Sequence, residues 1–189
     1  MGRMVSYGHS WIDGDGASSP SKTIAALAAS QLGLKLDNRG VGGSSSTGTA
    51  ALVATNPPPR AAVYLLMTGL NDLRLGGEAP SYLQAYRASL TATLGAFRAA
   101  APEAVVVVVE QPHLVDFSQH APHNLGSNDL VDVYNAELRR AAAAASALVA
   151  VAEDWDAGSM LDPDTVHAND AGHACLAGAV VAAVTAAWR

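Results

Sequence analysis

The stretch VSYGHSWIDG, residues 5–14, alternates apolar and small side chains as far as Gly8. The residues that follow it are too rich in Gly, Asp, Ser and Pro to continue a strand. The pattern predicts a short β-strand from Met4 to Tyr7, followed at once by a turn that carries Ser10. Residues at the carboxyl end of a strand in an open α/β sheet face the crevice where ligands bind. Ser10 is therefore presented to that crevice, as a turn residue or as a nucleophile.

Apolar runs alternate with helical patterns along the rest of the chain, which predicts a parallel sheet covered by helices on both faces. Further strands are expected at residues 35–39, 62–67, 104–109 and 148–152, and helices at residues 19–32, 50–54, 80–100, 130–147 and 170–188. The near-continuous apolar run at 62–67 suits a central strand buried on both faces. The expected fold class is α/β, a three-layer α/β/α sandwich of about five parallel strands, formed by one domain over residues 1–189.

Composition limits the class of protein. The chain has 189 residues, of which 50% are hydrophobic and 15% charged, which excludes a disordered protein. A net charge of -6 with scattered basic residues argues against a nucleic-acid partner. The single cysteine, Cys175, has no partner for an internal disulfide and is expected in the core. No leader pattern and no run near the roughly 18 apolar residues of a membrane span are found, so no membrane partner and a cytoplasmic location are expected. The oligomeric state is not predicted.

Several polar residues fall at the carboxyl ends of the predicted strands. They are Ser10, the glycine turn at 40–43, Asn71 and the segment 162–167, which ends in His167. Acyl transfer through a serine needs this set of groups: a hydroxyl, a base, a carboxylate that fixes the base, and donors for an oxyanion. Asp164 and Asp162 compete for the imidazole, and the spacing of three residues before His167 favours Asp164.

These residues carry a resemblance to the SGNH, or GDSL-type, hydrolase family. Residues 7–11 (YGHSW) resemble the family's first block, residues 38–43 (NRGVGG) its second, residues 69–72 (GLND) its third and residues 164–173 (DTVHANDAGH) its last. The four blocks span nearly the whole chain in the family's order. The chain departs from the family at His9, where an Asp usually precedes the serine.

The resemblance implies a flavodoxin-like sandwich and hydrolysis of esters without a metal or other cofactor. It implies Ser10 as the nucleophile, His167 as the base and Asp164 as the partner of that base. It also implies an oxyanion hole made by the N–H groups of Ser10 and Gly43 and the side-chain amide of Asn71. Because side chains alternate at a strand end, His9 is expected to point away from the face that presents Ser10.

Substrate contacts are expected from Trp11, as a wall of the acyl pocket, and from His113 in the aperiodic segment 111–128, which is assigned to the crevice. His113, His120 and His123 lack the spacing of zinc motifs, so no metal is expected. His173, in the first turns of the last helix, is expected to be structural.

The function indicated is a serine esterase acting on a small-molecule ester with a short acyl group, such as an O-acetyl group on a carbohydrate or a small polar molecule. Two alternatives use the same fold. One is an acyltransferase with the same site, and the other is a binding module that has lost its chemistry.

Overall fold

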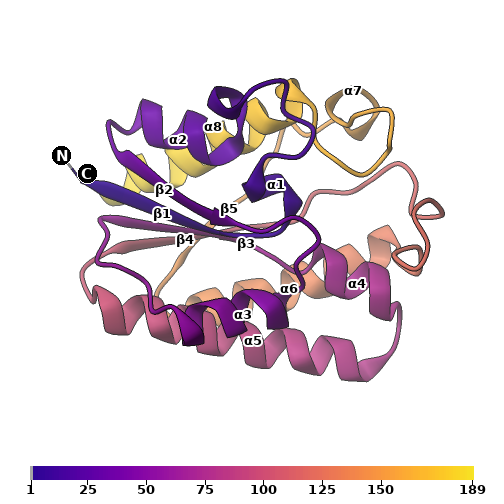
Figure 1. The fold of residues 1–189 in the computed structure, drawn as a ribbon, viewed down its shortest axis with the longest axis horizontal. Helices are drawn as coiled ribbons and strands as arrows, with labels where there is room; N and C mark the ends of the chain where they lie inside the picture. The colour runs from indigo at the N-terminus through magenta and orange to yellow at the C-terminus, as the bar shows by residue number, and fades with distance from the viewer. Residues whose placement is uncertain (1) are drawn as a thin grey trace.

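The computed structural model describes residues 2–189, which contain a five-stranded parallel sheet (Figure 1). The strands are β1 (Arg3–Gly8), β2 (Lys35–Gly40), β3 (Val63–Met67), β4 (Val105–Val109) and β5 (Leu148–Ala150). Their order is β2-β1-β3-β4-β5, which is the flavodoxin-like order. The strands expected from the sequence are confirmed, and their ends differ from expectation by at most two residues.

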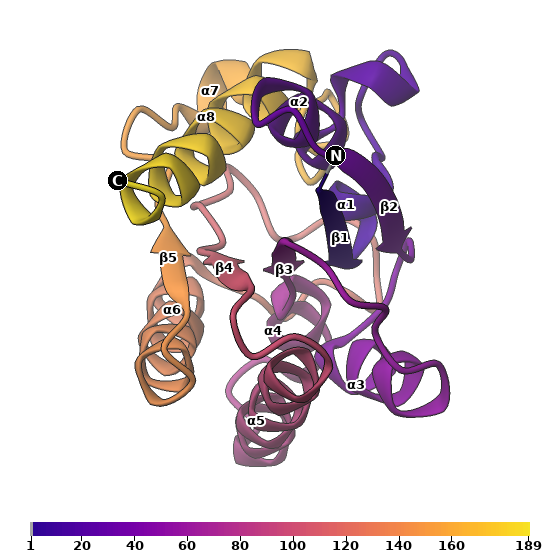
Figure 2. The same ribbon diagram turned by 90° about the vertical axis from the view of Figure 1, so that its left-hand side faces the viewer.

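Helices cover both faces of the sheet, as Figure 2 shows. One face carries α2 (Ile24–Gln31) and α8 (Asp170–Ala187), and the other carries α3 (Ser46–Thr55), α5 (Pro80–Ala100) and α6 (Asn128–Ala144). Three short helices, α1 (Ser10–Asp13), α4 (Leu70–Gly76) and α7 (Ala157–Met160), lie at the carboxyl edge of the sheet (Figure 1). The three-layer sandwich predicted from the sequence is confirmed.

Local capping explains where the helices differ from the sequence prediction. The helix expected at 19–32 divides into a 3-10 turn, η1 (Pro20–Lys22), and α2, because the Thr23 side chain accepts the Ala26 N–H and starts a new helix. The helix expected at 50–54 begins earlier, since Ser45 caps it by accepting the Gly48 N–H. The short helices α1, α4 and α7 were not expected, because four to seven residues are too few to show a helical period.

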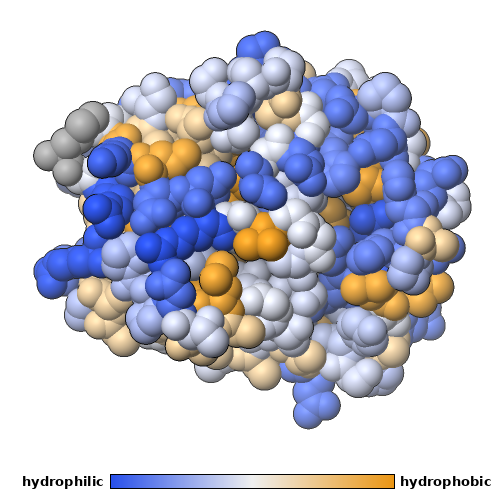
Figure 3. Space-filling view, viewed as in Figure 1, coloured by the Kyte–Doolittle hydropathy of each residue, from blue (hydrophilic) through white to orange (hydrophobic). Residues whose placement is uncertain are grey.

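The core lies on both sides of the central strands. All five residues of β3 are fully buried. Aromatic rings fill one side of it, with Phe97 stacked on Tyr64 at a centroid distance of 4.6 Å and tilted against Tyr7 at 5.2 Å. Hydrophilic residues cover much of the face shown in Figure 3, and hydrophobic residues form separate patches on it. The buried central strands therefore support the loops at the carboxyl edge of the sheet.

Within residues 2–189, α8 is the one helix long and apolar enough to cross a membrane, by length and composition only. The sequence predicted no such run. One third of the helix, 33%, is buried, and it packs against α2 and β5. Cys175, expected in the core, is only partly buried on this helix, and burial raises the pKa of its thiol.

Candidate active site

The turn after β1 places Ser10 at the carboxyl edge of the sheet. β1 ends at Gly8, and Ser10 is already the first residue of α1. His9 caps this helix, because its Nδ1 accepts the Trp11 N–H at 3.4 Å. Ser10 is 5% exposed. The sharp change from strand to helix therefore holds the serine at the end of a central strand.

Asp164 and His167 form a close pair at the same edge. Asp164 Oδ2 lies 2.5 Å from His167 Nδ1, and Asp164 Oδ1 accepts the N–H groups of Val166 and His167, both at 2.9 Å. Burial raises the pKa of Asp164, but these hydrogen bonds outweigh burial and leave the pKa below its ordinary value. Asp162 contacts only the backbone of this loop, where its N–H donates to the His167 carbonyl. The geometry favours Asp164 over Asp162 as the partner of the imidazole.

Trp11 joins the two halves of the site. Its Nε1 donates to the Val166 carbonyl at 3.0 Å, across 155 positions of sequence, and its ring stacks on Trp155 at 5.5 Å. Trp11 is fully buried. The ring packs beneath the loop and holds the segment that carries His167, and its expected role as a wall of the acyl pocket stays a prediction.

The loop after α1 approaches His167 from its other side. His167 Nε2 lies 3.8 Å from Asp15 Oδ2, and Ser10 Oγ and His167 Nε2 are not hydrogen-bonded to each other. The Asp15 N–H donates to the Ser10 carbonyl at 2.9 Å, and this hydrogen bond holds Asp15 against the Ser10 turn. Catalytic hydrogen bonds are often long before a substrate binds. Asp15 was not singled out from the sequence, although its position between Gly14 and Gly16 marks a tight turn.

Three groups are expected to form the oxyanion hole. The N–H groups of Ser10 and Gly43 donate no hydrogen bond within residues 2–189. Gly43 has φ +73°, a conformation that favours glycine, and a Cβ there would meet no other atom within 4 Å. The Asn71 amide donates one hydrogen to the Ser44 carbonyl at 3.0 Å and keeps a second N–H.

Asp72 ties these donors together. Its carboxylate accepts the Ser46 N–H at 2.8 Å and the Ser46 hydroxyl at 2.6 Å, which joins the start of α3 to α4. Asp72 is 2% exposed, and this burial raises its pKa in spite of the Ser46 hydrogen bonds. The glycine turn and Asn71 are thus held in a fixed relation.

His9 is fully buried, and burial lowers its pKa to about 3. A hydrogen bond with the Gln111 side chain raises this pKa, and the charges of His167 and Arg74 lower it further. The ring is therefore neutral near pH 7. Since Nδ1 accepts a hydrogen bond, the ring hydrogen lies on Nε2. The neutral ring performs the capping role, and its side chain is enclosed by protein.

The aperiodic segment after β4 carries three histidines with separate contacts. His113 Nε2 lies 2.8 Å from Asp132 Oδ1, and His120 Nε2 lies 2.9 Å from the Asp164 carbonyl. Residues 2–189 contain no group of three or more metal-binding side chains. His113 also lines a hollow of about 250 Å³ together with Gln111. Its contact with a substrate stays a prediction.

His173 has the structural role expected from the sequence. It is fully buried, and its Nδ1 accepts the Ile24 N–H at 3.2 Å while its Nε2 lies 3.1 Å from the Asp15 carbonyl. His173 therefore holds the start of α2 and the Asp15 turn against α8.

The fold and the order of these residues define an α/β hydrolase with a serine after its first strand and an Asp-x-x-His segment before its last helix. The sequence matches the GDSL-like lipase/acylhydrolase family over residues 6–175, and the chain belongs to this family. It is a hydrolase acting on ester bonds.

Solved structures show the same fold. An α/β hydrolase from the metagenome of Lake Arreo has a TM-score of 0.72 and 20% identity, with 97% of this chain and 95% of that chain covered. A variant of an acetyl xylan esterase from Geobacillus stearothermophilus gives 0.72 and 18%, covering 97% and 94%. The lipase/acylhydrolase from Enterococcus faecalis gives 0.76 and 16%, covering 99% and 97%. The search of curated proteins gave no match.

Proposed function

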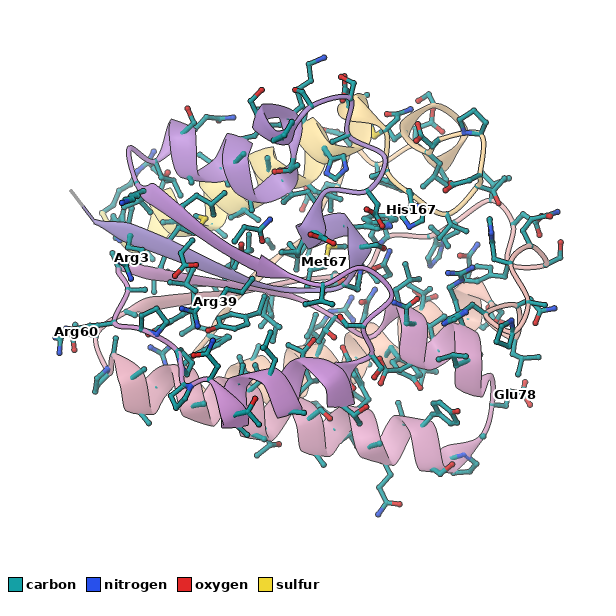
Figure 4. All side chains as sticks on the ribbon, in the orientation of Figure 1. Arg3, Arg39, Arg60, Met67, Glu78 and His167 are labelled. Atoms are coloured by element: carbon teal, nitrogen blue, oxygen red, sulfur yellow. The ribbon has the colours of Figure 1, made fainter. Side chains whose placement is uncertain are left out.

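We propose that this hydrolase cleaves a carboxylic ester with a short acyl group through a covalent acyl-enzyme, with Ser10 as nucleophile. The observation that carries this proposal is the Asp164–His167 pair, which the Trp11–Val166 hydrogen bond joins to the Ser10 turn. His167, labelled in Figure 4, and the Ser10 turn come from the two ends of the chain and lie at one edge of the sheet.

The hydrogen bond to Asp164 assigns the roles of the imidazole nitrogens. His167 Nδ1 donates its hydrogen to the Asp164 carboxylate, so the lone pair of the neutral ring is on Nε2. Nε2 takes the proton of the Ser10 hydroxyl as Oγ forms a bond to the ester carbonyl carbon. The imidazolium then gives this proton to the leaving alcohol as the ester C–O bond breaks.

The second half of the reaction repeats these steps with water. His167 Nε2 takes a proton from water, whose oxygen attacks the acyl carbon, and then returns the proton to Ser10 Oγ as the acid leaves. In both halves the carbonyl oxygen becomes negative. The N–H groups of Ser10, Gly43 and Asn71, which have hydrogens left to donate, stabilise this charge.

The substrate we propose is an ester with a small acyl group, such as an O-acetyl group on a carbohydrate or a small polar molecule. The likeness in fold to an acetyl xylan esterase supports this choice. The chain also covers almost the whole of that structure, so its size matches a known sugar-ester hydrolase without a large added lid.

Substitution of Ser10 tests the proposal. Ser10→Ala should lower turnover of a short-chain aryl ester on the order of a million-fold, because the nucleophile is lost. The matched control is Ser21→Ala, on the exposed turn η1, which should keep wild-type turnover. An organophosphonate probe should label the wild-type protein and not Ser10→Ala. Retention of most activity by Ser10→Ala would overturn the nucleophile assignment, and a maximum of activity at long acyl chains would overturn the short-acyl assignment.

A further inference from the structure

Six residues contain enclosed side-chain nitrogen or oxygen atoms that make no hydrogen bond within residues 2–189. They are His9, Thr68, Arg74, Gln111, Tyr134 and Thr165. Three of them follow the ends of β1, β3 and β4, and the others lie on α4, on α6 and beside the Asp164–His167 pair. Buried polar groups in folded proteins are nearly always paired. Their concentration at one edge indicates that a polar ligand completes this region.

Arg74 is the charged member of this set. The residue is 5% exposed, its Nε and Nη2 are enclosed without a partner, and no carboxylate within residues 2–189 lies within 4.0 Å of it. It follows Asn71 by three positions on α4, so the two side chains lie on the same face of that helix. Its carbonyl accepts the Leu125 N–H at 2.9 Å, which fixes the backbone from the loop side. The guanidinium is therefore held next to a predicted oxyanion donor.

Asp164, the carboxylate whose charge acts on Arg74, already accepts hydrogen bonds from other groups. Burial lowers the pKa of Arg74, and the charge of Asp164 raises it. Asp164, however, directs both oxygens to the Val166 N–H and to His167. Burying an ionised group without a partner is costly, and removing one partner of a buried pair leaves such a group behind. An anion is thus the missing partner of Arg74.

Gln111 supplies a second free donor. Its backbone is fixed on both sides by Asn135, which donates to the Gln111 carbonyl at 2.8 Å and accepts the Gln111 N–H at 2.9 Å. The side-chain amide is enclosed; a hydrogen bond with its oxygen raises the pKa of the His9 ring, and its N–H2 group has no partner. Gln111 acts on the buried His9 ring, which is also within the electrostatic range of Arg74. His9 therefore serves as a positioning residue behind these two side chains.

We propose that Arg74, together with the Gln111 amide, forms a subsite that binds a carboxylate carried by the ester substrate. A guanidinium matches a carboxylate with two parallel hydrogen bonds, and these are stronger than neutral ones. The proposal rests on the proposed function, since it assigns a substrate class to the same site. The carboxylate can belong to the acyl group or to the alcohol, and both have the same chemistry at Arg74.

Two pairs of probes separate these sources. 4-Nitrophenyl hemisuccinate against 4-nitrophenyl butyrate places the charge on the acyl side. 4-Carboxyphenyl acetate against its methyl ester places the charge on the alcohol side. In at least one pair, the wild-type protein should show a kcat/KM for the charged ester at least about tenfold above that for the neutral ester, as expected for hydrogen bonds to a charged group. Equal or lower values for the charged ester in both pairs would overturn the proposal.

Substitutions identify the group responsible. Arg74→Gln should reduce the charged-to-neutral ratio about 10- to 100-fold, and Arg74→Lys should keep part of it. The control is Arg60→Gln, an equal change of charge on a residue that pairs with Glu103 at the other end of the sheet (Figure 4). It should keep both the rates and the ratio of the wild type. A ratio that stays unchanged in Arg74→Gln would overturn the proposal, and the wild-type comparison decides it if that variant does not fold.

Failure of the subsite and failure of the proposed function give different results. If the neutral esters are hydrolysed through Ser10 but no pair shows a charge preference, the subsite is wrong and the esterase stands. If neither pair is hydrolysed, binding of succinate to the wild-type protein is measured by calorimetry, with Arg74→Gln beside it. Binding that requires Arg74 keeps the subsite without the esterase, and absence of binding overturns both.

Discussion

The two ends of the sheet differ in how completely their polar groups are paired. At the amino edge, Arg98 donates to four carbonyls of the turns before β4 and β5, at 2.6 to 3.3 Å. The Tyr64 hydroxyl donates at 2.7 Å to a carbonyl of the segment before β3. At the carboxyl edge, six residues keep enclosed polar atoms without partners. The polar groups at the amino edge are paired within the protein, and the carboxyl edge has polar atoms left that a ligand can pair.

This difference separates stability from function within one small protein. An unpaired buried polar group costs about 1–3 kcal/mol relative to a paired one. Such groups persist where they are used in binding or catalysis, which natural proteins support with stability gained elsewhere. The carboxyl edge should therefore respond to substitution mainly in activity, and the amino edge mainly in stability.

Among the groups around Ser10, the largest effect should come from the carboxylate that holds the imidazole. Asp164→Asn keeps the shape of the side chain but removes the acceptor that fixes the hydrogen on His167 Nδ1. Turnover of a short-chain aryl ester should fall about 10⁴-fold, because the ring then takes the wrong tautomer. Steady-state kinetics measure this, with urea unfolding to show that the variant is folded.

Asp162→Asn is the matched control for this substitution. Asp162 lies on the same loop, two residues earlier, and its backbone rather than its carboxylate is joined to His167. Turnover should stay within about twofold of the wild type, since rate effects follow contact with the reacting groups. A loss of similar size in both variants would mean that the loop as a whole, and not one carboxylate, sustains activity.

Most of the scaffold could be predicted from the sequence, and so could the edge of the sheet at which the proposed reacting groups lie. Strand ends appear in the sequence as apolar runs closed by Gly or polar residues, and parallel strands end at one edge. This is why Ser10, Asn71 and His167 could be assigned to one crevice from residue types and order. The local caps at Thr23 and Ser45 moved helix ends without changing the topology.

The environment of each side chain could not be predicted in the same way. Trp11 is buried and donates to the Val166 carbonyl, a contact across 155 positions that no local pattern contains. Arg74 follows Asn71 on a helix too short to show a period, so its side chain could not be assigned a direction. The burial of Arg74 and Gln111 and their lack of partners depend on several loops at once. The role inferred for these two residues therefore needs the structure.

An intermediate effect should appear in the pH dependence of stability. His9 directly follows β1, and burial lowers its pKa to about 3. Between about pH 6.5 and 3 the unfolded chain binds a proton at this residue that the folded chain does not bind. The free energy of unfolding therefore rises with pH in this window and is lost as the pH falls, by up to about 1.4 kcal/mol per unit.

His9→Asn removes this dependence while keeping a capping side chain. In urea unfolding at pH 7, 6, 5 and 4, the variant should lose stability less steeply below pH 6.5 than the wild type. Its advantage should grow toward low pH and disappear near neutrality, apart from a constant offset. Parallel curves for the two proteins would contradict the assignment of a neutral, buried ring at this position.

The smallest effect is the most direct comparison of the two edges, because it uses the same chemical change at both. Tyr64→Phe removes a hydroxyl that donates to the Pro59 carbonyl, and should cost about 1 kcal/mol in the free energy of unfolding. Tyr134→Phe removes a hydroxyl that is enclosed without a partner, and should cost nothing or stabilise the protein by up to about 1 kcal/mol. Both tyrosines are at most 2% exposed, so changes in solvent contact are similar. Urea midpoints at equal slope measure the two differences. An equal loss in both variants would show that the Tyr134 hydroxyl has a partner in solution, and the carboxyl edge would then be as well satisfied there as the amino edge.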